Sequence, residues 1–201
     1  MEISTKTTKN GKIKIYADGE ELFTVPAVIW YSSHLKDGDE VTTEELSLLK
    51  EQGDSSSAFD SAMRMLSLRA HSEHELRQKL SMKYSPRAAQ AAIDRLKELG
   101  LIDDEKFALL FAEELYNRKG YAPKRILLEL RNRGINDNYA ENALNALDID
   151  KEIGIIKVIE KYRLTKDSTP KEKDRVIRRL LNMGYSYQDI SEYIHFYGQE
   201  D

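Results

Sequence analysis

Leucines recur in this sequence at an interval of 50 residues, at Leu80, Leu130 and Leu180. A turn position follows four residues after each leucine, and these positions are Tyr84, Gly134 and Gly184. A helical stretch precedes each leucine, and each turn leads into another stretch with helical spacing. Self-similarity at one fixed period is the signature of a tandem array. The sequence therefore predicts a mainly α protein with three three-helix, helix-turn-helix-like repeats in a tandem row.

The clearest copy of this repeat is the segment Lys119–Leu147. Pro123 suits the first turn of a helix, where a missing N–H costs nothing. Apolar residues at helical spacing follow it. Gly134 can adopt the left-handed conformation that ends a helix, and Asn136 or Asp137 can cap the next one. This segment therefore predicts two helices joined by a tight turn.

The first 54 residues differ from the rest, because they predict β-strands. Lys12–Tyr16 alternates polar and apolar residues, and Leu22–Val25 is a matching return strand. Asp18-Gly19 between them is a strong signal for a hairpin turn. Val28–Tyr31 begins either a helix or a third strand. We therefore expect a small β-hairpin extension before the helical array.

Two further signals end this N-terminal extension. Thr42 or Thr43 predicts the cap of a short helix that runs through Lys50. Gly53–Ser57 has the composition of a linker. The predicted domains are an acidic extension at residues 1–54 and three-helix repeats at residues 58–100, 101–147 and 150–198.

Capping residues place the helices of the other repeats. Ser72 and Glu75 have the spacing of a capping box, and Thr169-Pro170 marks the start of a helix. Ser186 predicts the cap of the last helix, whose apolar positions are Ile190, Tyr193, Ile194 and Tyr197.

Composition limits the possible classes of protein. The chain has no cysteine, which excludes disulfides and thiolate chemistry. No apolar run approaches the roughly 20 residues of a membrane helix. The N-terminus lacks the apolar core of a signal peptide. We therefore expect a cytoplasmic protein that does not bind membranes.

The net charge of −4 is unevenly distributed along the chain. Residues 1–57 hold 6 basic and 11 acidic residues, whereas residues 58–201 hold 25 and 24. A uniformly basic surface would have favoured autonomous nucleic-acid binding. This composition supports such binding only weakly.

Two clusters of basic residues are the candidate sites for a partner or for DNA. The first basic cluster starts at Arg118 and holds the candidates Lys119, Lys124, Arg125, Arg131 and Arg133. The second basic cluster consists of Arg175, Arg178 and Arg179, which with Asn182 fall on one helix face. We expect these surfaces to meet acidic protein surface or DNA phosphates. The alternative is a solvated helix face, which is common in amphipathic helices.

Other polar groups have simpler structural explanations. His71 and His74 lie three residues apart, but a zinc site needs more ligands than these two. Asp103–Glu105 matches a cap and first-turn acids, which the helix dipole favours. Phe107 and Phe111 share a helical stripe and are expected in the core. No Gly-rich phosphate loop or nucleophile–base signature is present, so we expect no metal, no cofactor and no enzymatic activity.

Three segments of the chain, taken together, resemble the RecX family of regulators of the RecA recombinase. They are RAHSEHELRQKL (Arg69–Leu80), LKELGLIDDEKFALLFAEE (Leu96–Glu114) and KGYAPKRILLELRNRGI (Lys119–Ile135). The resemblance implies that the three-helix repeats form a curved row, a crescent that lies in the groove of a RecA filament on single-stranded DNA. It also implies inhibition of the recombinase's ATPase, strand exchange and co-protease activities, without catalysis by this chain. We expect the protein to act as a monomer.

Two other functions compete with this interpretation. Helix pairs joined at a glycine turn are also typical of DNA-binding helix-turn-helix modules, which would predict a basic recognition helix. The overall acidity argues against that function. A plain helical scaffold for another partner is the second competitor.

Overall fold

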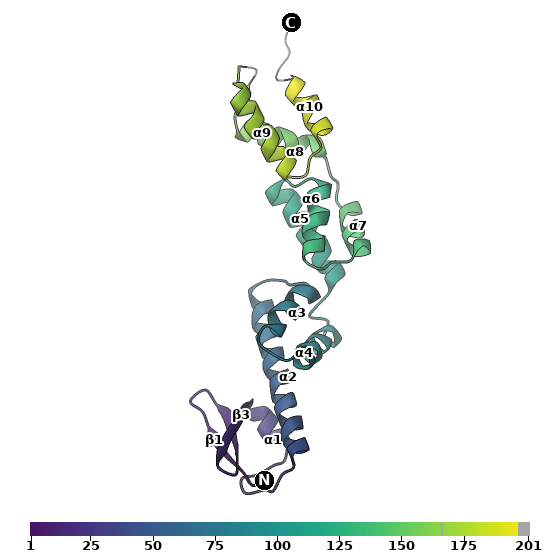
Figure 1. The fold of residues 1–201 in the computed structure, drawn as a ribbon. Coiled ribbons are helices and arrows are strands. Elements are labelled where there is room, and N and C mark those ends of the chain that lie inside the picture. Colours follow the sequence, from purple (N-terminus) through teal and green to yellow (C-terminus); the bar gives the residue numbers. More distant parts are fainter. Residues whose placement is uncertain (166, 197–201) are drawn as a thin grey trace. The chain divides into compact units, whose positions relative to one another are not determined.

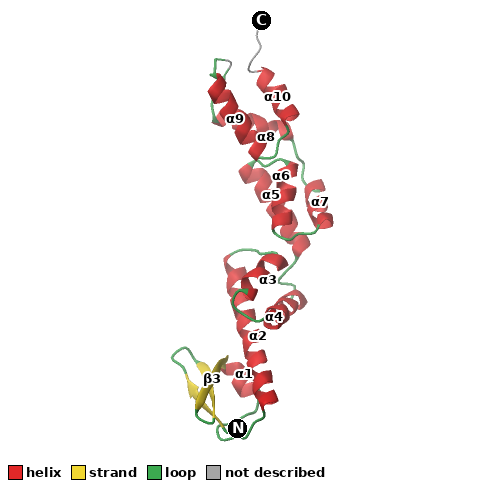
Figure 2. Ribbon diagram, in the orientation of Figure 1, coloured by secondary structure: helices red, strands yellow, loops and turns green. Residues whose placement is uncertain are grey.

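The computed structural model describes residues 1–165 and 167–196, with the side chains of His195 and Phe196 excepted. Contacts within the chain divide it into two units, Met1–Asp103 and Asp104–Asp201. The predicted Tyr197 lies outside the described residues. The described part is mainly helical, and its strands all belong to the first unit (Figures 1 and 2). Its helices are too short or too polar to cross a membrane, judged over the same residues.

The first unit combines a small sheet with helices. Its elements are β1 (Ile3–Thr7), β2 (Lys12–Ala17), β3 (Glu20–Pro26), α1 (Ala27–Ser32), α2 (Thr43–Leu68), α3 (Glu73–Ser81) and α4 (Pro86–Glu98). In its described residues, the second unit contains helices joined by turns and loops. Its elements are α5 (Asp104–Lys119), α6 (Pro123–Asn132), α7 (Asp137–Asn145), α8 (Lys151–Lys161), α9 (Pro170–Asn182) and α10 (Tyr187–Phe196).

The sheet is antiparallel, with the strand order β1-β2-β3. The predicted hairpin of β2 and β3 is confirmed, and both Asp18 and Gly19 have positive φ at its turn. The sequence did not predict β1, because its segment ISTKT has a single apolar residue, Ile3. That side chain is fully buried and pairs with Ala17 on β2. Pairing with the open edge of β2 therefore creates a strand that its own residues do not indicate.

Helix α2 is one continuous helix, so the predicted linker at Gly53–Ser57 is wrong. Thr42 caps the helix and forms a capping box with Glu45. The helix then continues past Lys50 to Leu68. At Gly53, a Cβ would lie 2.5 Å from Cγ1 of Val25 on β3, so this glycine permits the close approach of helix and sheet. The first part of α2 packs on β3, and the later part of α2 packs on α3 and α4.

The 50-residue period corresponds to three groups of three helices, α2–α4, α5–α7 and α8–α10. The leucines that define the period, Leu80, Leu130 and Leu180, are all 0% exposed. Gly134 and Gly184 have φ values of 73° and 93°, as a left-handed helix end requires. The following amides, of Ile135 and Tyr185, donate to the carbonyls of Leu130 and Leu180. The repeated pattern therefore encodes one packed unit with one type of turn.

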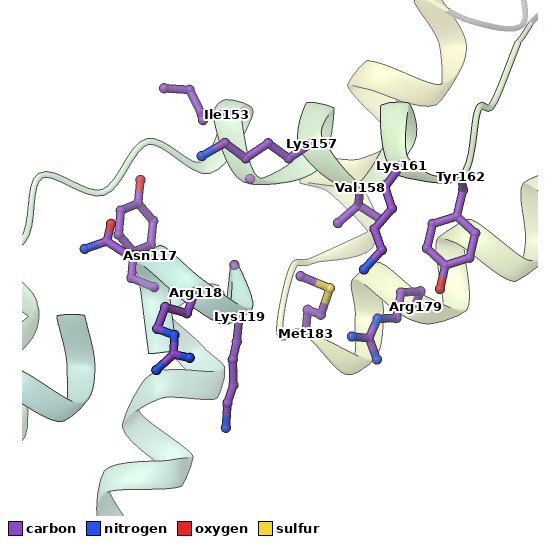
Figure 3. Close-up of a pocket in the computed structure, with 13 residues that line it drawn as sticks. Asn117, Arg118, Lys119, Ile153, Lys157, Val158, Lys161, Tyr162, Arg179 and Met183 are labelled. Carbon is purple, nitrogen blue, oxygen red and sulfur yellow. The ribbon is translucent and has the colours of Figure 1, made fainter. Parts of the chain in front are cut away.

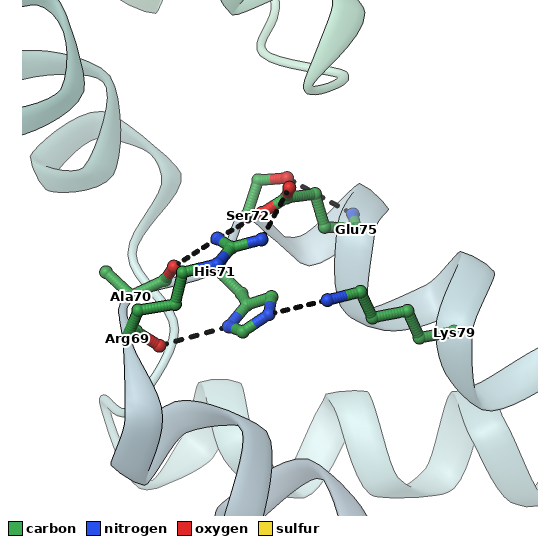
Figure 4. A network of polar contacts seen from close by, with 6 residues as sticks. All are labelled: Arg69, Ala70, His71, Ser72, Glu75 and Lys79. Carbon is green, nitrogen blue, oxygen red and sulfur yellow. Dashed lines mark hydrogen bonds and ion pairs between the residues drawn. The ribbon is translucent and has the colours of Figure 1, made fainter.

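A polar network joins the end of α2 to α3 around His71 (Figure 4). The His71 ring is 5% exposed, with Nδ1 3.0 Å from the Arg69 carbonyl and Nε2 2.9 Å from Nζ of Lys79. A protonated lysine only donates, so Nε2 accepts and Nδ1–H donates to the carbonyl. Arg69 also binds both carboxylate oxygens of Glu75, whose amide is capped by Ser72. The network therefore holds His71 as a neutral imidazole.

Replacing His71 by glutamine is expected to remove an acid-sensitive part of the first unit's stability. Burial lowers the pKa of the His71 imidazole, and the charges of Arg69 and Lys79 act in the same direction. A lowered pKa means that the unfolded chain takes up the proton first, so the free energy of unfolding falls as the pH drops below about 6.5. Urea unfolding, followed by the fluorescence of the buried Trp30, measures this dependence between about pH 7 and pH 5.

The matched control is His74→Gln, because His74 is an exposed histidine of the same segment. It should keep the wild-type dependence on pH, whereas His71→Gln should flatten it. An equal dependence in wild type and His71→Gln would show that another group causes the effect.

Candidate functional site

The second basic cluster lies on the exposed face of α9. A capping box between Thr169 and Glu172 starts this helix, and Pro170 occupies its first position. Val176 and Leu180 are buried in the core of the α8–α10 group. The side chains of Arg175, Arg178 and Arg179 are exposed. The three arginines therefore share one exposed face of α9, as predicted, because the buried residues occupy the opposite face of the helix.

The three arginines of this cluster have different local contacts. The guanidinium of Arg175 lies 5.7 Å from the ring centre of Tyr162. Nε of Arg178 donates to the Asp174 carbonyl at 3.3 Å. Arg179 lines a pocket described below. Contacts to a ring and to a neutral carbonyl leave the positive charges of Arg175 and Arg178 uncompensated, so this face can bind an anionic surface.

Some arginines of the first basic cluster contact other residues of the chain, whereas its lysines are exposed. Nε of Arg131 lies 2.7 Å from Oδ1 of Asp137, and the guanidinium of Arg133 lies 4.5 Å from the ring centre of Phe111. Phe111 stacks on Phe107, which is buried as expected. Arg131 and Arg133 therefore have intramolecular roles. Lys119 and Lys124 are exposed, and Nζ of Lys119 lies 5.7 Å from the ring centre of Tyr121.

Arg125 belongs to the packed junction between the α5–α7 and α8–α10 groups. Its Nη2 lies 2.6 Å from Oε1 of Glu129, and its guanidinium lies beside the ring of Tyr121. Its Cβ and backbone lie so close to Gly184 that a Cβ on Gly184 would approach the Arg125 amide nitrogen to 2.8 Å. The side chain of Arg125 therefore contributes packing as well as charge.

Tyr185 and the backbone complete this junction. The Tyr185 hydroxyl donates to the Gly120 carbonyl at 3.0 Å, and burial raises the pKa of this phenol to about 12. Gly154 on α8 leaves room for the ring, since a Cβ there would lie 1.9 Å from the Tyr185 oxygen. The Ala122 amide also donates to the Met183 carbonyl at 2.9 Å. These contacts hold the end of α5 beside α8 and the end of α9.

A basic pocket of about 190 Å³ opens at this junction (Figure 3). Its cationic lining residues come from three helices: Arg118 and Lys119 from α5, Lys157 and Lys161 from α8, and Arg179 from α9. Among the residues that the structure describes, no aspartate or glutamate lines it. In Figure 3, Lys161 and Arg179 extend to the same side of the pocket, around the apolar side chains of Val158 and Met183. We call these five cations and their surroundings the junction pocket.

The junction pocket brings together two of the predicted site residues, Lys119 and Arg179. The other six predicted residues do not line it. Lys157 and Lys161 were missed, although they lie four residues apart and therefore on one face of α8. Ile155 and Ile159, each two residues before one of these lysines, are buried. This alternation of buried isoleucines and lysines was the signal in the sequence. Only the fold shows that the lysine face of α8 lines a pocket with residues of α5 and α9.

No metal site emerges from the described residues. Among them, no three His, Asp or Glu side chains are grouped so as to hold a metal ion. His71 and His74 have separate partners, Lys79 and Gln78. Both histidines therefore have structural contacts.

Comparison with known proteins identifies similar sequences. The family model described as "RecX, first three-helix domain" matches residues 58–96, and "RecX, second three-helix domain" matches residues 103–144. "Regulatory protein RecX" of Salmonella arizonae is 38% identical over 146 residues, which cover 67% of this chain and 87% of that protein. The protein of the same name from Caldanaerobacter subterraneus subsp. tengcongensis is 28% identical over 190 residues, covering 93% and 94%.

Two solved structures have a similar fold. The crystal structure of regulatory protein RecX has a TM-score of 0.64 at 21% identity, covering 97% of this chain and 98% of that one. The crystal structure of RecX from Lactobacillus salivarius has a TM-score of 0.56 at 28% identity, covering 71% and 96%.

Proposed function

This chain belongs to the RecX family of non-catalytic RecA regulators, and we propose that it inhibits RecA filaments on single-stranded DNA. The inhibited activities are the recombinase's ATPase, strand exchange and co-protease functions. The site of action is the cytoplasm, where the recombinase meets DNA, and the active form is a monomer. The exposed arginine face of α9 carries this proposal, because it offers an uncompensated positive surface for an acidic partner.

The proposed mechanism is occupation of the filament groove. Each three-helix group has its own buried core, so each can present a surface without the others rearranging. The predicted repeats 58–100, 101–147 and 150–198 would then contact successive recombinase protomers. Bridging them stabilises an inactive arrangement, and filling the groove excludes a second DNA or a repressor substrate.

The proposed contact residues do not contribute equally. Exposed Arg175, Arg178 and Lys124 reach the partner directly. Lys119 and Arg179 act at the mouth of the junction pocket. Contacts within the chain already use Arg125, Arg131 and Arg133, so we propose smaller direct contributions from these three arginines.

The ATPase of RecA on single-stranded DNA, titrated with this protein, tests the proposal. We expect inhibition at amounts well below those of the recombinase, because one bound molecule affects several protomers. Binding to the same DNA without RecA is measured in parallel. Unchanged ATPase together with tight, salt-sensitive DNA binding would reject filament regulation and favour a direct nucleic-acid-binding module.

A further inference from the structure

We propose that the junction pocket is a binding site for phosphate groups. Its ligand is a compact phosphate such as pyrophosphate, or the phosphate portion of a nucleotide or of a nucleic-acid strand. The inference does not depend on RecA as a partner, because the ligand chemistry follows from the pocket itself.

Charge is the first argument for this ligand. Within the described part of the chain, five cationic side chains line the pocket and no carboxylate does. Among the described residues, none of the ion pairs involves Lys157, Lys161 or Arg179. Arg118 has an exposed partner, Glu114, at 3.5 Å, which screens it only weakly. Like charges so gathered repel one another, and a bound polyanion relieves that repulsion.

The helix dipole does not explain the whole arrangement. Cations are favoured in the last turn of a helix, and Arg118, Lys119, Lys161 and Arg179 all occupy such positions. Lys157 lies outside the last turn of α8. The dipole also acts on each helix separately, whereas here residues near three helix ends line one pocket. Cationic residues brought to one pocket by separate elements are typical of a ligand site.

The backbone around the pocket is held in place before any ligand binds. Tyr185 bonds the Gly120 carbonyl, and the Ala122 amide bonds the Met183 carbonyl. Val158 and Met183 are almost fully buried beneath the cations. An apolar base strengthens the field of the charges above it. Binding therefore requires ordering of the lysine and arginine side chains but no movement of the helices.

Size selects the part of the ligand that is bound. The pocket volume of about 190 Å³ is below the roughly 300–1,000 Å³ of sites that enclose whole drug-sized molecules. It suits one or two phosphate groups and leaves a nucleoside outside. Arginine and lysine are the residues that bind phosphate oxygens with charge-assisted hydrogen bonds.

Calorimetric titration of the full chain with pyrophosphate, at constant ionic strength and without RecA, tests the site. We expect saturable binding of one pyrophosphate per chain. Lys157→Gln/Lys161→Gln and Arg179→Gln should each weaken it about tenfold or more, because each removes charge-assisted hydrogen bonds. Lys171→Gln is the matched control, since Lys171 is exposed on α9 but does not line the pocket, and it should bind as wild type does.

Competition then identifies the source of the phosphate. Displacement of pyrophosphate by oligothymidylate supports a nucleic-acid strand, and displacement by a nucleoside triphosphate alone supports a free nucleotide. Absence of saturable binding, or equal weakening in the pocket variants and in Lys171→Gln, would overturn the proposal. ATPase inhibition by a wild-type protein that fails to bind pyrophosphate would reject the pocket and leave the proposed function standing.

Discussion

Replacing Arg175, Arg178 and Arg179 together by glutamate is expected to weaken inhibition of the RecA ATPase about 100-fold or more. The change turns three positive charges on one exposed face of α9 into three negative ones. Juxtaposed like charges at an interface cost several kcal/mol, and about 2.7 kcal/mol already corresponds to 100-fold. The ATPase titration measures the effect as the concentration that gives half inhibition.

The fold should survive this substitution, because Val176 and Leu180 keep the opposite face of α9 buried. The control is the triple reversal of Lys6, Lys9 and Lys12, exposed cations of the N-terminal extension that change the net charge equally. We expect the control to inhibit as wild type does. Unchanged inhibition by the α9 variant would exclude the second basic cluster as a partner-binding surface.

Replacing Gly184 by alanine is expected to destabilise the second unit by about 3 kcal/mol or more. Gly184 has a φ of 93°, which is strained for any residue with a Cβ and costs about 1–3 kcal/mol. The new Cβ would also lie 2.6 Å from Cβ of Arg125 and 2.8 Å from its amide nitrogen. Such overpacking adds about 1–3 kcal/mol, because the backbone of Arg125 has to move.

Urea unfolding, followed by the far-UV circular dichroism of the helices, measures this loss. Gly100→Ala separates strain from crowding, because Gly100 also has a positive φ of 65° but no atom of the described residues beyond its chain neighbours lies within 4 Å of its Cβ position. We expect that control to lose only about 1 kcal/mol. Equal losses at Gly184 and Gly100 would contradict the close contact with Arg125.

Much of the fold was predictable from short-range signals. The 50-residue leucine period predicted three three-helix repeats, and its leucines are completely buried. Asn136, Thr169 and Ser186 cap the helices that they were expected to begin. Each cap depends on residues within about five positions of one another, and the 50-residue period is read directly from the spacing of residues along the chain, so the sequence alone contains the required information.

The errors in the first unit have a different cause. Gly53 looked like part of a linker, because glycine and serine are common in flexible segments. Its function is instead to let α2 approach Val25, a residue 28 positions earlier in the chain. The strand Ile3–Thr7 exists because the edge of β2 was available to it. Both features depend on a surface that forms only when distant segments meet.

The repeat, the helix ends, the hairpin and the exposed arginine face of α9 could all be predicted from the sequence, because they follow from local backbone preferences and helical periodicity. Tertiary structure alone decided which cations meet in the junction pocket and which are used within the chain. Lys119, Lys157 and Arg179 are as many as 60 residues apart. They line one pocket only because Tyr185, Gly154 and Gly184 permit close packing of two helix groups. No local sequence pattern encodes packing between residues so far apart in the chain.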